Sequence, residues 1–183
     1  MSIVLLIGFV AVIWVVELVD GFTGNSLDQY GIVPRHLIGL VGVPLTPFLH
    51  VGLGHVLSNT LPLLVLGGFV AFRGKTTILG LTAFVTIVGG LGIWVIGRPG
   101  VHLGASILVF GFFGYLVARG WYDRRPLSII VAVVVLVLYG GLIFGVLPLQ
   151  GFVSWEGHLT GMLAGILYAR ITRRGRLPQA GGR

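Results

Sequence analysis

Three segments of this 183-residue chain place polar side chains inside apolar runs. Ser106 lies near the head of the run 104–111, His158 lies near the start of a later run, and His55 opens an earlier run that also carries Asn59. A serine hydroxyl is a weak nucleophile that needs a base in contact with it, and histidine is the usual base because its pKa lies near neutrality. These residue types therefore predict nucleophilic catalysis by a Ser106–His158 dyad.

Attack of a hydroxyl on a carbonyl group creates an oxyanion, which fixed hydrogen-bond donors must stabilise. His55 and Asn59 are four residues apart, so on a helix they lie about 40° apart and share one face. Together with the backbone N–H of Ser106 they are predicted to form the oxyanion hole. No carboxylate is placed to orient His158, because Glu156 is two residues away and points elsewhere on a helix, so a dyad is expected and not a triad.

The composition places these residues in a membrane. The chain is 56% hydrophobic and only 9% charged, with a mean hydropathy of +1.04, whereas soluble domains average about 25% charged residues. Its length fits one domain, residues 1–172, followed by a basic, flexible tail at 173–183. The chain has no cysteine and no His-Glu-x-x-His motif, so we expect neither a metal site nor a cofactor.

The expected fold class is an all-α polytopic membrane protein, a bundle of six transmembrane helices. Each expected span approaches the roughly 17–25 apolar residues that cross a bilayer. The connection 20–54 is so apolar that it is expected to lie partly in the membrane. The predicted spans are Ile3–Val19, His55–Phe72, Thr76–Ile96, Gly104–Arg119, Pro126–Val146 and Trp155–Ile171.

The basic residues predict an orientation for this bundle. Ten of the twelve lysines and arginines fall on one side of it, and only Arg35 and Arg98 fall on the other. The positive-inside rule then places both termini in the cytoplasm and the polar residues at the extracytoplasmic side. The compact, Gly-rich loops favour a plasma (inner) membrane. We read the net charge of +7 as this topology signal and expect no nucleic-acid partner. His102, in the loop before Ser106, is expected to be an exposed loop residue.

Small residues predict how the serine and the histidine meet. Gly157, Gly161 and Gly165 form a stripe on the sixth segment, and Gly111 and Gly114 offer a similar surface on the fourth. Such stripes let membrane helices approach closely. We expect the two helices to pack tightly enough for His158 to reach Ser106.

With these motifs in place, the chain resembles the rhomboid family of intramembrane serine proteases. The resemblance runs from about residue 28 to 172. The matching blocks are Pro47-Phe48-Leu49-His50, His55-x-x-x-Asn59, Gly104-x-Ser106-x-x-x-x-Gly111 and His158-x-x-Gly161-x-x-x-Gly165.

The resemblance implies Ser106 as nucleophile and His158 as general base, with His55, Asn59 and the Ser106 N–H as the oxyanion hole. It implies supporting roles for Gly104, Phe110, His50 and Gly161. It also implies transmembrane protein substrates, which enter laterally from the lipid bilayer between the second and fifth helices and are cut near their extracytoplasmic ends.

Two positions depart from the family pattern. Ile107 stands where the family usually has glycine, and a β-branched side chain there is expected to crowd the serine turn or the oxyanion pocket. Phe110 stands where the family has a tyrosine stacked on the histidine, and it keeps the stacking surface. Ile107 favours an alternative function, a catalytically inactive rhomboid-like protein that binds transmembrane clients. A third class, a small transporter or channel, predicts paired charges in mid-membrane, and the sequence shows no such pair.

Overall fold

The computed structural model describes residues 1–149 and 153–173, and these residues fold as helices with one isolated β-bridge between Ile32 and His102. The rest of the tail predicted at 173–183 lies outside the described residues. The α-helices are α1 Ser2–Phe22, α2 Gly42–Leu45, α3 Gly52–Ala71, α4 Lys75–Phe84, α5 Gly90–Ile96, α6 Ser106–Asp123, α7 Pro126–Tyr139 and α8 Trp155–Ile171. Short 3-10 helices cover Asp28–Tyr30, Leu37–Leu40, Thr46–Phe48 and Gly140–Val146, and a π-helical turn covers Val85–Gly89.

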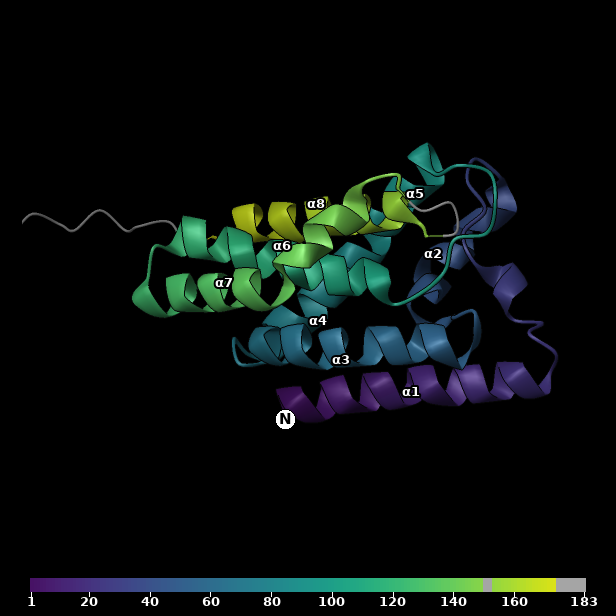
Figure 1. The fold of residues 1–183 in the computed structure, drawn as a ribbon, viewed down its shortest axis with the longest axis horizontal. Helices are drawn as coiled ribbons and strands as arrows, with labels where there is room; N and C mark the ends of the chain where they lie inside the picture. The colour runs from purple at the N-terminus through teal and green to yellow at the C-terminus, as the bar shows by residue number, and fades with distance from the viewer. Residues whose placement is uncertain (150–152, 174–183) are drawn as a thin grey trace, which may run out of the picture.

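The long helices run roughly along one axis, with α6 and α8 packed against each other at the centre (Figure 1). Helices α3, α6 and α8 all begin at one end of the bundle, which we call the site end, and finish at the opposite, basic end. Helix α1 packs on α3, and α7 packs on α6. The π-turn joins α4 and α5 into one continuous helix that contacts α8. The sequence predicts that Ser106, His158 and the pair His55 and Asn59 lie at one side of the bundle. The three helices that carry them do begin at the same end.

Four helical stretches are long and apolar enough to cross a membrane, which makes this chain an integral membrane protein. They are Ser2–Phe22, Gly52–Ala71, Lys75–Ile96 and Pro126–Val146. Helices α6 and α8 do not reach that threshold, so the count of six spans stays a prediction. Most of α6 is buried by other parts of the protein. A helix that contacts protein and not lipid can be less apolar than a lipid-facing span.

The predicted span boundaries are close at several ends and wrong for the fourth span. Helix α8 has the predicted bounds, but α6 begins at Ser106 instead of Gly104 and continues to Asp123. Gly104 has φ +123°, which no helix contains, so the helix cannot start before the serine turn. Its last turn persists because Arg119 pairs with Asp123 one turn later, at 2.9 Å.

The connection 20–54 folds onto the bundle. Ile32 exchanges two backbone hydrogen bonds with His102, at 2.8 and 2.9 Å, which ties this connection to the loop before Ser106. Leu37 and Ile38 remain 81% and 76% exposed. Exposed apolar side chains on a short helical segment suit contact with lipid, and the partial membrane embedding of this connection stays a prediction.

Candidate active site

Glycine lets α6 and α8 approach until their backbones touch. A Cβ atom added to Gly161 would lie 2.4 Å from the Ile107 carbonyl oxygen, and one added to Gly165 would lie 1.9 Å from the Gly111 carbonyl oxygen. A Cβ atom added to Gly114 would lie 2.5 Å from the Met162 carbonyl oxygen. The predicted small-residue contact is therefore confirmed, and it sets the spacing between the helices that carry Ser106 and His158.

The His158 ring is held on two sides. It stacks on Phe110, with ring centroids 3.9 Å apart and planes 8° from parallel. Its Nδ1 lies 2.9 Å from the Gly145 carbonyl oxygen, at the end of the 3-10 turn that follows α7. A carbonyl oxygen only accepts hydrogen bonds, so Nδ1 carries the proton and the neutral ring keeps its lone pair on Nε2. That tautomer is the one a general base needs.

Ser106 is the first residue of α6, and Phe110 follows it by one turn on the same face. The stack of His158 on Phe110 therefore places the imidazole on the face of α6 that carries the serine. Among the described residues no hydrogen bond joins Ser106 to His158, so their direct contact stays a prediction. The first amides of a helix have no intrahelical acceptor and favour negative charge, which suits an oxyanion beside the Ser106 N–H.

His55 lies against the turn that precedes the serine. A Cβ atom on Gly104 would lie 2.7 Å from His55 Cε1 and 2.9 Å from its Nε2, so only glycine leaves room for the ring. His55 Nδ1 accepts a hydrogen bond from the Val51 backbone N–H at 3.3 Å. In the neutral ring the proton then resides on Nε2, the nitrogen nearer to the serine turn. This is the donor that an oxyanion hole requires.

His50, whose ring packs next to His55, also contacts this turn. Its Nε2 accepts a hydrogen bond from the Ala105 backbone N–H at 3.0 Å, and its ring packs edge-on against His55 with centroids 4.9 Å apart. His50 lies in the loop before α3 and is 1% exposed. Burial, with a smaller contribution from His55, lowers the pKa of His50 to about 4, so the ring stays neutral and able to accept.

Asn59 lies one turn below His55 on α3. Its Nδ2 donates to the His55 carbonyl oxygen at 2.9 Å, within the same helix. An amide nitrogen carries two protons, so one remains for another acceptor. The side chain is 7% exposed, and its share in an oxyanion hole stays a prediction.

Ile107 does not crowd the serine turn, and that expectation is wrong. Its side chain is 2% exposed and lies between two glycines, with its Cδ1 3.1 Å from a Cβ built on Gly89 and its Cγ1 3.1 Å from one built on Gly161. The side chain points into the interface between α6, α8 and the π-turn because successive residues of a helix lie about 100° apart. Ile107 fills the space that the two glycines leave.

The expectation that His102 is exposed is also wrong, because the connection 20–54 covers it. His102 is 5% exposed, and its Nε2 lies 2.9 Å from the Arg98 carbonyl oxygen. In the neutral ring, Nδ1 therefore accepts from the Ser154 hydroxyl at 2.7 Å, and Ser154 Oγ accepts from the Gly157 N–H at 3.2 Å. This chain of bonds fixes the first turn of α8, next to His158.

A buried carboxylate adds a second bond to the same turn. Glu156 is 1% exposed, and its Oε1 accepts from the Arg98 backbone N–H at 3.1 Å and pairs with the Arg98 Nε at 3.4 Å. Glu156 thus points away from His158, as expected. No sequence pattern predicts this ion pair between Arg98, in the loop after α5, and Glu156, in the first turn of α8.

The described residues contain no cluster of three or more His, Asp or Glu side chains that could hold a metal ion. The chemistry on offer is that of a hydroxyl, a neutral imidazole and a set of N–H donors.

Comparison of the sequence with known proteins identifies its family. Residues 39–175 match the family model described as the Rhomboid domain. The chain is 41% identical over 172 residues to the uncharacterized protein Rv1337 of Mycobacterium tuberculosis (strain ATCC 25618 / H37Rv), covering 89% of this chain and 72% of that protein. It is 39% identical over 177 residues to the uncharacterized protein ML1171 of Mycobacterium leprae (strain TN), covering 92% and 70%. The chain belongs to the rhomboid family.

Proposed function

We propose that this protein is an intramembrane serine endopeptidase that cuts transmembrane segments of other membrane proteins. The observation that carries the proposal is the state of His158. Its Nδ1 proton is engaged by the Gly145 carbonyl, and its ring lies on Phe110, one turn from Ser106. This leaves Nε2 of the half-buried His158 without a proton, on the face of α6 that begins with Ser106, which is the state that a general base requires.

In the proposed reaction, His158 Nε2 takes the Ser106 hydroxyl proton while Oγ attacks the substrate carbonyl carbon. The oxyanion that forms is stabilised by the Ser106 N–H, the His55 Nε2–H and the Asn59 amide. The imidazolium then gives its proton to the departing amine, which leaves an acyl-enzyme. Water, activated by the same nitrogen, releases the new carboxylate and restores the hydroxyl.

Substrate access is proposed to be lateral, between α3 and α7. This is supported by the outer face of α7, which packs on α6 and leaves Val137 and Leu138 exposed at 79% and 62%. The rhomboid family acts on membrane-protein substrates in the bilayer. The protein is placed in a plasma membrane with both termini in the cytoplasm, so the site end faces the extracytoplasmic side. Cleavage then occurs near the extracytoplasmic end of the substrate helix.

The test is cleavage of a model transmembrane substrate by the purified protein in liposomes. Ser106→Ala and His158→Ala are each expected to abolish cleavage and labelling by a fluorophosphonate. Ser26→Ala removes an exposed hydroxyl that bonds Thr23 and is expected to change neither. Undiminished cleavage by Ser106→Ala would refute the dyad. Wild-type protein that binds the substrate but neither cleaves it nor takes the label would instead favour the inactive client-binding alternative.

A further inference from the structure

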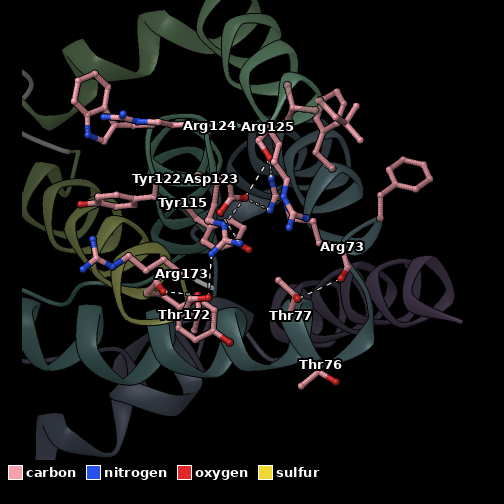
Figure 2. Close-up of a pocket in the computed structure, with 18 residues that line it drawn as sticks. Arg73, Thr76, Thr77, Tyr115, Tyr122, Asp123, Arg124, Arg125, Thr172 and Arg173 are labelled. Atoms are coloured by element: carbon pink, nitrogen blue, oxygen red, sulfur yellow. Dashed lines mark hydrogen bonds and ion pairs between the residues drawn. The ribbon is translucent and has the colours of Figure 1, made fainter. Parts of the chain in front are cut away.

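The basic end of the bundle contains a cavity of about 1460 Å³, far from the serine. The final turns of α3, α6 and α8 and the first turns of α4 and α7 surround it (Figure 2). Five arginines line it, whereas Asp123 is the acid among its described lining residues. The arginines are Arg73, Arg119, Arg124, Arg125 and Arg173.

Asp123 is already engaged by two of these arginines. Arg73 Nη1 lies 3.0 Å from its Oδ2, and Arg119 Nη2 lies 2.9 Å from its Oδ1. Arg73 also donates to the Ser128 hydroxyl at 2.8 Å, and both guanidinium groups lie 5.8 Å from the centre of the Tyr115 ring. These contacts form the floor of the cavity. The single negative charge of Asp123 balances only one of the two positive charges of Arg73 and Arg119.

Arg124 and Arg125 add positive charge at the rim. Within residues 1–149 and 153–173 no ion pair joins either of them to an acid. Both side chains are exposed, and Arg124 lies over the Trp121 ring, 5.8 Å from its centre. The described lining therefore carries an excess of four positive charges, which repel one another unless an anion lies between them.

Apolar side chains stand beside these cations. Phe72, Trp121 and Leu127 line the same cavity and are 82%, 73% and 73% exposed. They stand at the ends of apolar helices, where a bilayer passes from hydrocarbon to headgroups. A soluble anion would need the cations alone, whereas an amphiphile with an anionic head would contact both sets of residues.

We infer that this cavity binds the phosphate headgroup of an anionic membrane phospholipid, with the acyl chains along Phe72 and Leu127. Arginine suits this ligand because its planar guanidinium donates two parallel hydrogen bonds to a phosphate. Basic pockets between transmembrane helices are a recurrent form of lipid recognition. The inference does not depend on the proposed protease activity.

The experiment measures lipid binding by native mass spectrometry and by the thermal shift of the full chain in dodecyl maltoside. The probes are dioleoylphosphatidylglycerol, dioleoylphosphatidylcholine and sn-glycerol 3-phosphate. We expect phosphatidylglycerol to remain bound and to raise the melting temperature, and phosphatidylcholine and glycerol phosphate to do neither. The double variant Arg124→Gln/Arg125→Gln is expected to weaken phosphatidylglycerol binding about thirtyfold, since each arginine near an anionic headgroup contributes about fivefold.

Arg170→Gln is the matched control, because Arg170 is exposed near the end of α8 but does not line the cavity. It is expected to bind phosphatidylglycerol as the wild type does. Equal binding of the two lipids, or equal loss in Arg170→Gln and in the double variant, would overturn the site. Stabilisation by glycerol phosphate as large as that by phosphatidylglycerol would refute the claim that the ligand is a lipid and would indicate a soluble phosphate. If the double variant does not fold, Arg124→Lys/Arg125→Lys, which keeps the charges, must retain the preference for phosphatidylglycerol, or the site is refuted.

Discussion

Gly165→Ala tests whether the contact between α6 and α8 sets the catalytic geometry. The added Cβ would lie 1.9 Å from the Gly111 carbonyl oxygen, whereas ordinary contacts begin at 3.4 Å. The obstacle is backbone, so no side-chain rotation relieves it, and the helices must separate locally by about 1.5 Å. Overpacking of this kind costs about 1–3 kcal/mol of unfolding free energy.

The same separation moves His158, which lies about two turns from Gly165 on α8. A displacement of about 1 Å in a reacting group costs about a hundredfold in rate. We therefore expect Gly165→Ala to lower kcat on a transmembrane substrate about a hundredfold and to lower the melting temperature in detergent.

The control is Gly68→Ala in α3, where an added Cβ meets no atom within 4 Å. Both substitutions remove the same backbone freedom from the unfolded chain, which by itself stabilises by about 0.4–1 kcal/mol. The difference between the variants isolates the helix contact. Gly165→Ala protein with the turnover and melting temperature of Gly68→Ala protein would refute the reasoning.

Three further substitutions test single contacts of the site. Ile107→Gly empties a filled interface and should cost about 2–5 kcal/mol of unfolding free energy in thermal or chemical unfolding; a variant as stable as the wild type would show that the side chain fills no space. Gly104→Ala forces the His55 ring aside and should lower kcat about 10²–10³-fold, as loss of an oxyanion donor does. Gly100→Ala is the control, because Gly100 has a similar φ of +136° but open space around it. It introduces the same backbone strain without a clash with His55 and should keep kcat. Equal losses of kcat in Gly104→Ala and Gly100→Ala would assign the effect to backbone strain. Phe110→Ala should lower kcat and Phe110→Tyr should retain it, and equal turnover in the two would remove the stack from the mechanism.

The sequence predicted the parts of the site that side-chain type and helical spacing determine. Ser106 and His158 lie in first turns at one end of the bundle, because apolar runs and small-residue stripes fix where helices form and how closely they pack. It failed at Ile107, where the family pattern suggested a conflict. The space that receives that side chain lies against Gly89 of the π-turn Val85–Gly89, which no periodicity in the sequence predicts.

Contacts between distant loops were also beyond the sequence. His102 is buried only because the connection 20–54 folds back and pairs Ile32 with it. The bond chain through Ser154 to the start of α8 then follows from that burial. Neither feature leaves a local pattern, since pairing at a separation of seventy residues depends on the whole fold.

The partner of His158 shows how the imidazole is oriented here without an acidic residue. A carboxylate without a cationic partner would carry a large desolvation cost at membrane depth, and the buried Glu156 carboxylate nearby is already paired with Arg98. The Gly145 carbonyl fixes the Nδ1–H tautomer at no such cost, because a backbone carbonyl oxygen is already present and needs a hydrogen-bond donor. A Cβ on Gly145 would lie 2.7 Å from the Phe110 ring and 3.3 Å from His158 Nδ1, so the residue that offers the carbonyl must be small. His158 is thus oriented by a backbone carbonyl and by the small residue that offers it, so side-chain types alone predict Ser106 and His158 but not what holds the imidazole.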